Sequence, residues 1–217
     1  MGSVRLAFEP PGGDGGEERK GSQDEGGGQD EGGGQDEGGG QDEGGGIAGW
    51  TLRGAEPGDL DGLPTGFAGA PPAAVAAPAG GPSVSAGAAL PHPNGAERID
   101  HLVVFTGDLD RTVAAMVGAG LPLRRVRDPH EPGPPVRQAF LRLGEALLEV
   151  VESPEHGAGP ARFWGITFRV ADIDAAARLL ADRLGGVRDA VQPGRRIATV
   201  RREAGLGLPV ALISGRD

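Results

Sequence analysis

Two stretches of the chain share one pattern: Asp100-His101-Leu102-Val103-Val104-Phe105-Thr106-Gly107-Asp108-Leu109-Asp110 and Trp164-Gly165-Ile166-Thr167-Phe168-Arg169-Val170-Ala171-Asp172-Ile173-Asp174. In each, a run of β-branched and apolar residues predicts a strand, and the Asp-apolar-Asp sequence after it predicts a helix start. The pattern indicates one supersecondary unit used twice. The copies differ at one position, where the first has His101 and the second has Gly165.

The residues after each stretch predict the same order of further elements. Following the first strand and the helix from Asp108, strands are predicted at 123–127, 136–143 and 146–152. Following the second strand and the helix from Asp172, strands are predicted at 187–191, 197–202 and 209–213. We therefore predict an α+β domain over residues 97–217. It consists of two tandem β-α-β-β-β modules, 97–153 and 160–214, that form a curved, incomplete barrel around a cleft.

Residues 1–96 have a different, low-complexity composition. Four copies of Gln-Asp-Glu-Gly-Gly-Gly run from Gln23 to Gly46, and we expect this acidic tract to be disordered, as either an expanded surface loop or an interaction tail. Strand-forming residues at 4–8 and 47–52 flank the tract and predict a hairpin. Residues 54–96 are rich in Pro, Ala and Gly and are expected to form a linker on the surface.

The composition excludes several classes of function. Most of the net charge of −10 lies in residues 1–46, so the remainder has no basic stripe for nucleic acid. The chain has no Cys and no Tyr, and Lys20 is its single lysine, which leaves Ser, Thr, His, Asp, Glu or a metal-bound water for chemistry. No apolar run is long enough to span a membrane, and no segment resembles a signal peptide, so we expect a cytoplasmic protein.

Glu149 and His101 are the strongest candidates for a functional site. Glu149 lies inside the apolar run Leu147-Leu148-Glu149-Val150-Val151, where a carboxylate must be paired, protonated or metal-bound unless it faces solvent. His101 lies in a similar apolar run and is either a site residue or a buried, neutral histidine with one hydrogen bond.

These residues resemble those of the vicinal oxygen chelate superfamily, which includes glyoxalase I, extradiol dioxygenases and bleomycin-resistance proteins. The resemblance rests on Asp100-His101-Leu102-Val103-Val104 at the start of the first unit and on Leu148-Glu149-Val150-Val151 in its last strand. It covers residues 97–214 and leaves the N-terminal region without a counterpart. One scaffold in this superfamily hosts many reactions, so the resemblance implies the fold and not the reaction.

The resemblance also implies a divalent metal site with one ligand from the first strand and one carboxylate from the last strand of each unit. His101 and Glu149 occupy these positions in the first unit, whereas Gly165 and Ala211 occupy them in the second and cannot ligate through a side chain. Three outcomes stay open. A substitute ligand completes the shell, a chelating substrate completes it, or the site has lost its metal. The candidate substitutes are His130, Gln138, Glu155 and His156.

The first functional hypothesis is a module that binds a small organic molecule in the cleft, with a metal weakly held or absent. The alternative is a metal-dependent lyase, isomerase or dioxygenase that uses His101 as ligand and Glu149 as ligand or catalytic base. A third is an assembly role for the acidic tract. The expected substrate contacts are His101, Gln138, Trp164 and Arg196. We expect no nucleic-acid or membrane partner, and the two units pair either within one chain or in a homodimer.

Overall fold

The computed structural model describes residues 4–9, 46–68, 92–130 and 136–215. The predicted acidic tract and most of the predicted linker lie outside these residues. The described elements are, in order, β1 (Val4–Glu9), β2 (Gly46–Arg53), β3 (Thr65–Ala68), β4 (Ala96–Thr106), α1 (Leu109–Gly118), β5 (Leu123–Arg127), β6 (Gln138–Leu143), β7 (Ala146–Glu152), η1 (Pro154–His156), β8 (Arg162–Val170), α2 (Ile173–Leu180), η2 (Ala181–Arg183), β9 (Arg188–Asp189), β10 (Arg196–Thr199), η3 (Arg202–Ala204) and β11 (Val210–Ser214). No helix among them is long and apolar enough to cross a membrane.

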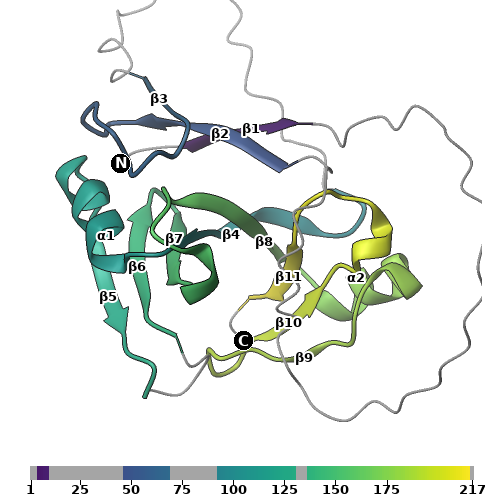
Figure 1. The fold of residues 1–217 in the computed structure, drawn as a ribbon. Coiled ribbons are helices and arrows are strands. Elements are labelled where there is room, and N and C mark those ends of the chain that lie inside the picture. Colours follow the sequence, from purple (N-terminus) through teal and green to yellow (C-terminus); the bar gives the residue numbers. More distant parts are fainter. Residues whose placement is uncertain (1–3, 10–45, 69–91, 131–135, 216–217) are drawn as a thin grey trace, which may run out of the picture.

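Eight strands form one large sheet in the order β5-β6-β7-β4-β8-β11-β10-β9 (Figure 1). The order is mirrored about the central pair: β4 and β8 are antiparallel, β7 runs parallel to β4, and β11 runs parallel to β8. The sheet is open, with β5 and β9 at its edges. The predicted α+β class is confirmed. We call β4 to β7 with α1 the first half, and β8 to β11 with α2 the second half.

Both helices begin where the sequence predicts, because an aspartate caps each one. The Asp108 carboxylate accepts a hydrogen bond from the Arg111 amide, and the Asp172 carboxylate accepts from the Asp174 and Ala175 amides. These contacts satisfy amides that have no partner inside the helix.

Alternation along the strands gives the large sheet two different faces. On β4, Leu102 and Val104 are fully buried in a cluster with Leu109 and Met116 of α1, so we call this side the helix face. Because side chains alternate in a strand, His101, Val103 and Phe105 point to the opposite side, which we call the polar face. The candidate site therefore lies on the side of the sheet away from the helices.

The strands β1, β2 and β3 form a second, smaller sheet that packs against the large sheet, where β2 contacts β8 (Figure 1). β1 pairs with β2 in the antiparallel direction, and β3 pairs with β2 in the parallel direction. Trp50 is buried in the same core cluster as Leu102, and its ring meets Phe163 edge to face at 5.2 Å. The N-terminal region therefore contributes to the core, although its overall composition is of low complexity.

Residues 54–68 also differ from the predicted surface linker. Leu60 and Leu63 are buried in the core cluster, and Thr65–Ala68 forms β3. The sequence pattern is misleading here because two leucines among prolines and glycines show no strand or helix period.

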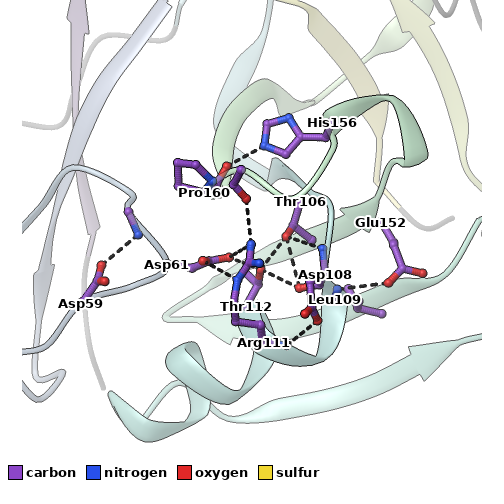
Figure 2. A network of polar contacts seen from close by, with 12 residues as sticks. Asp59, Asp61, Thr106, Asp108, Leu109, Arg111, Thr112, Glu152, His156 and Pro160 are labelled. Atoms are coloured by element: carbon purple, nitrogen blue, oxygen red, sulfur yellow. Dashed lines mark hydrogen bonds and ion pairs between the residues drawn. The ribbon is translucent and has the colours of Figure 1, made fainter.

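Asp61 fastens this segment to the first half (Figure 2). Its carboxylate is 8% exposed and accepts from Arg111 Nε at 2.8 Å and Nη2 at 3.2 Å, and it also accepts from the Thr112 hydroxyl. Arg111 Nη2 donates further to the Gly159 carbonyl at 2.8 Å. One arginine of α1 thus joins the N-terminal segment to the loop before β8.

Candidate functional site

A row of hydrogen-bonded polar side chains crosses the large sheet from one edge strand toward the other. We call it the polar line; it consists of Arg127 on β5, Gln138 on β6, Glu149 on β7, His101 and Asp100 on β4, and Arg195 in the turn before β10. Buried polar groups of this kind need mutual hydrogen bonds to offset their lost hydration.

Glu149 lies at the middle of the polar line. Its Oε1 accepts from Gln138 Nε2 at 2.7 Å, and the Gln138 carbonyl oxygen accepts from Arg127 Nε at 2.7 Å. The Glu149 side chain keeps 19% of its surface exposed but is densely surrounded by protein. Burial therefore raises the pKa of the Glu149 carboxyl above its ordinary value, although the charges of His101 and Arg127 oppose the shift.

His101 is held on one side and faces Glu149 on the other. Its Nδ1 lies 3.0 Å from Asp100 Oδ2, and its Nε2 lies 3.8 Å from Glu149 Oε2. The second distance exceeds a hydrogen bond, so Nε2 and Oε2 border the same small gap. A polar ligand atom beside this pair, about 3 Å from each, can contact both.

Asp100 is a carboxylate at neutral pH. Burial alone raises its pKa, but hydrogen bonds and charges from His101 and Arg195 outweigh burial and hold the pKa well below its usual range. Since a carboxylate only accepts hydrogen bonds, we assign the hydrogen between Asp100 and His101 to Nδ1.

The strand registers give the second half the same geometry with different residues. His101 lies two residues before Val103, which pairs with Glu149. Gly165 lies two residues before Thr167, which pairs with Ala211. The positions of His101 and Glu149 in the first half thus correspond to those of Gly165 and Ala211 in the second.

Gly165 has a packing reason to lack a side chain. A Cβ atom at this position would lie 2.8 Å from the carbonyl oxygen of Pro209, closer than real Cβ contacts allow. The same carbonyl accepts a hydrogen bond from the Ile166 amide at 3.0 Å, so it cannot move away freely. Any ligating residue at position 165 would therefore require a shift of the backbone.

The described residues do not fit a divalent metal site with a full set of protein ligands. None of them form a group of three or more His, Cys, Asp or Glu side chains suited to a metal ion. Gln138 is next to Glu149, but its carbonyl oxygen already accepts from Arg127. His101 and Glu149 alone leave most positions of a zinc or calcium shell to other donors.

The other proposed substitute ligands lie away from the polar line. His130 and Glu155 are exposed, and His156 Nε2 lies 2.6 Å from the Pro160 carbonyl in the loop beside Arg111 (Figure 2). They do not join His101 and Glu149.

The two arginines at the start of β10 have different partners, and the predicted substrate contact of Arg196 stays a prediction. Arg196 forms an exposed, two-point ion pair with Asp174 at 2.9 and 2.7 Å, at the start of α2. The neighbouring Arg195 instead reaches Asp100 on the polar line. Sequence reasoning did not select Arg195, Asp100 or Arg127; the turn at Gly194 indicates that one of the two arginines after it faces inward but does not decide which one.

Two further features border the site or lie behind it. Trp164 stacks on Phe105 with ring centres 4.8 Å apart, and Phe105 shares the polar face with His101. A pocket of about 400 Å³ lies on the helix face, beside Phe168, Leu180 and Leu212, and does not include His101 or Glu149.

Comparison with known proteins relates this arrangement to one family. A model of the Glyoxalase/Bleomycin resistance protein/Dioxygenase superfamily matches residues 98–204. No curated protein matches the chain. Among solved structures, methylmalonyl-CoA epimerase from Mycobacterium tuberculosis is 19% identical, with a TM-score of 0.46 over 57% of this chain and 91% of that one. The Streptomyces coelicolor methylmalonyl-CoA epimerase in complex with 2-nitronate-propionyl-CoA is 25% identical, with a TM-score of 0.45 over 56% of this chain and 99% of that one.

Proposed function

Residues 98–204 belong to the Glyoxalase/Bleomycin resistance protein/Dioxygenase superfamily, and from this premise we propose that the domain binds a small organic molecule at His101 and Glu149. In this proposal the two halves are tandem modules of a curved, incomplete barrel, and the polar face lines the cleft between them. The ligand contacts His101 and Glu149 directly, whereas Gln138 holds Glu149 in place.

The gap between His101 and Glu149 is the observation that supports this proposal most strongly. Nδ1 of His101 and Oε1 of Glu149 are occupied by Asp100 and Gln138, and the remaining Nε2 and Oε2 face each other at 3.8 Å. Two polar atoms held at this spacing suit a ligand hydroxyl that donates to Nε2 or Oε2, or a carbonyl oxygen that accepts from the Glu149 carboxyl in its protonated form. The stacked Phe105 and Trp164 offer an apolar wall farther along β4.

The raised pKa of Glu149 favours a second candidate, an enzyme that moves a proton at this site. A carboxylate with a raised pKa is a stronger base than an ordinary glutamate, and His101 is placed to take up or return a proton. In this second function Glu149 is the catalytic base. The proton transfer does not require a metal site with four protein ligands.

A ligand screen by NMR tests the proposed function. The full-length chain is mixed with small hydroxyl and carbonyl compounds, and we expect binders to shift the His101 ring signals and the Gln138 side-chain amide signals. The variant Glu149→Gln should lose at least about tenfold in affinity, because its amide oxygen would accept from Gln138 and its NH2 group, which only donates, would replace the acceptor Oε2. The matched control is Glu145→Gln in the exposed β6–β7 turn, which should bind as the wild type does. Binding that is equal in both variants would contradict the proposal.

Turnover separates the two candidates. Each compound that binds is incubated with the protein in deuterated water, and exchange of a ligand C–H proton or formation of a product is followed by NMR. Exchange that disappears in Glu149→Gln supports the enzyme, and binding without exchange supports the binding module.

A further inference from the structure

We propose that Asp100 and Arg195 are positioning residues that hold the His101 ring with its Nε2 facing Glu149. This inference rests on the proposed function, because it describes how the binding site at His101 and Glu149 is held in place. It assigns a role in the site to the second half of the sheet, which supplies Arg195 although its own positions 165 and 211 carry glycine and alanine.

A bulge in β4 brings Asp100 to His101. In the pairing with β8, Ile99 lies opposite Phe168 and His101 lies opposite Thr167, so Asp100 is an extra residue without a partner on β8. Neighbouring side chains of a regular strand point to opposite faces, whereas a bulge changes the direction of one of them. The bulge explains how the Asp100 carboxylate reaches Nδ1 of the next residue at 3.0 Å.

A tight turn brings Arg195 to the same place from the second half. The Arg195 amide donates to the Gln192 carbonyl at 3.2 Å, and Gly194 between them has a φ of +74°. Proline followed by a glycine with positive φ is typical of a type II turn. The Pro193-Gly194 turn therefore starts β10 with the Arg195 side chain directed across the end of β11.

The Arg195 guanidinium is fixed by four contacts and is 11% exposed. Its Nη2 and Nη1 donate to Asp100 Oδ1 and Oδ2 at 2.6 and 3.3 Å, its Nε donates to the Ser214 carbonyl at 2.8 Å, and its Nη1 also lies 3.3 Å from Gln192 Oε1. Paired donors from one arginine define the plane of a carboxylate as well as its place. Arg195 therefore determines how Asp100 meets the imidazole.

The consequence for His101 is a fixed tautomer. A neutral imidazole carries its hydrogen on one nitrogen, and the hydrogen bond made by the other nitrogen decides which one. With Asp100 as an ion-paired acceptor at Nδ1, the hydrogen stays on Nδ1 and the lone pair of Nε2 points toward the gap beside Glu149. Without this clamp the ring could rotate or exchange tautomers, and Nε2 would no longer be a defined acceptor for a ligand.

Nitrogen NMR of the imidazole rings tests this inference without a ligand. The chain contains four histidines, and the His101 signals are those missing from His101→Gln. Long-range ¹H–¹⁵N spectra of the ¹⁵N-labelled full-length protein are recorded at about pH 8.5, where an ordinary histidine is neutral. We expect the wild type to show the hydrogen on Nδ1.

Four variants separate positioning from folding. Asp100→Ala should lower the ratio of the Nδ1–H to the Nε2–H tautomer at least about tenfold, and Arg195→Ala should lower it about threefold to tenfold, because a charge-assisted hydrogen bond is lost or weakened. Arg196→Ala is the matched control and should leave the ratio unchanged, since Arg196 pairs with Asp174 instead. Arg195→Lys keeps the charge without the paired donors and should give an intermediate ratio; it replaces Arg195→Ala if that variant does not fold.

An Nε2–H tautomer in the wild type would overturn the inference, as would an unchanged ratio in Asp100→Ala or in the folded Arg195 variant. These outcomes are distinct from a failure of the proposed function. A protein that binds none of the screened compounds can still show the Nδ1–H tautomer and its loss in the variants. Conversely, ligand binding that persists with an unclamped His101 leaves the proposed function intact and removes this role for Asp100 and Arg195.

Discussion

The two halves of the large sheet have the same order of elements around β4 and β8 but different residues on the polar face. The first half carries His101 and Glu149, whereas the second has Gly165 and Ala211 in the same register. The halves also differ behind the sheet. α1 of the first half shares the large core cluster with Trp50 of the small N-terminal sheet and with Ile166 of β8, while the separate cluster around α2 contains six buried residues.

This difference teaches that a repeated backbone does not require a repeated function. Strand pairing depends on backbone hydrogen bonds and on an apolar face, and both halves keep these. The polar face is free to diverge, because side chains there contribute less to the core. The second half still pairs with the first through β8 and β4, and it supplies Arg195, which binds Asp100 of the first half.

Adding a side chain at Gly165 is the most direct way to break the comparison. Gly165→Ala should lower the free energy of unfolding by about 3 kcal/mol, since its Cβ would lie 2.8 Å from the Pro209 carbonyl oxygen. Gly186→Ala is the control, because a Cβ there meets nothing within 4 Å. Urea denaturation measures both. Equal stability of the two variants would mean that position 165 can accept a ligand such as the histidine of the first half.

Releasing the N-terminal sheet should weaken the first half more than the second. Asp61→Ala removes a carboxylate that is 8% exposed and binds Arg111 and Thr112, and we expect a loss of about 2 kcal/mol. The matched variant in the second half is Asp174→Ala; its pair with Arg196 is exposed, so the substitution should change the free energy of unfolding much less. Hydrogen exchange should accelerate at Trp50 and Leu52 in Asp61→Ala and stay unchanged in α2. Faster exchange in α2 alone would contradict this assignment.

The pH dependence of stability should differ between the halves because Glu149 titrates and Ala211 does not. The pKa of Glu149 is raised in the folded protein, so above the ordinary value of 4.5 the unfolded chain loses this proton first. The unfolded state then binds fewer protons, and wild-type stability falls as the pH rises from 4.5 through the folded pKa. The expected loss is about 1.4 kcal/mol for each unit of the shift.

Glu149→Gln should not show this loss. The difference in the free energy of unfolding between the variant and the wild type, measured by urea titration, should therefore grow over the same pH range. The depressed pKa of Asp100 acts in the opposite direction, because the stability it contributes is lost only as the pH falls below the ordinary aspartate range. A wild type and a Glu149→Gln variant with parallel pH profiles would show that burial does not perturb this carboxyl.

Metal removal should have the smallest effect. With two ligand-type side chains at the site, we expect elemental analysis of protein purified without a metal-affinity tag to find far less than one divalent ion per chain. A chelator should leave the melting temperature unchanged, since only a bound ion stabilises the fold by mass action. One equivalent of metal that is lost in Glu149→Ala would restore the metal-dependent alternative.

The sequence predicted the elements of the large sheet because alternation and aspartate caps are local signals. The predicted strands 123–127 and 146–152 coincide with β5 and β7, and both helices start after the predicted caps. The burial of Leu60 and Leu63 could not be predicted, since it depends on distant contacts such as Asp61 with Arg111. The contact of Arg195 with Asp100 could not be predicted for a similar reason. Two adjacent arginines look the same in a sequence, and the geometry of the turn before β10 decides which one faces Asp100.

The ion pair between Asp100 and Arg195 spans the boundary between two lengths of chain that each have strands and a helix of their own. If the chain were divided between β7 and β8 and the fragments produced separately, each fragment would lose a partner that it cannot replace. The fragment with His101 would keep the imidazole but lack the guanidinium that orients it through Asp100. If such fragments were recombined between related proteins, the orientation of the His101 ring would therefore be preserved only when the other fragment carried an arginine at the position of Arg195.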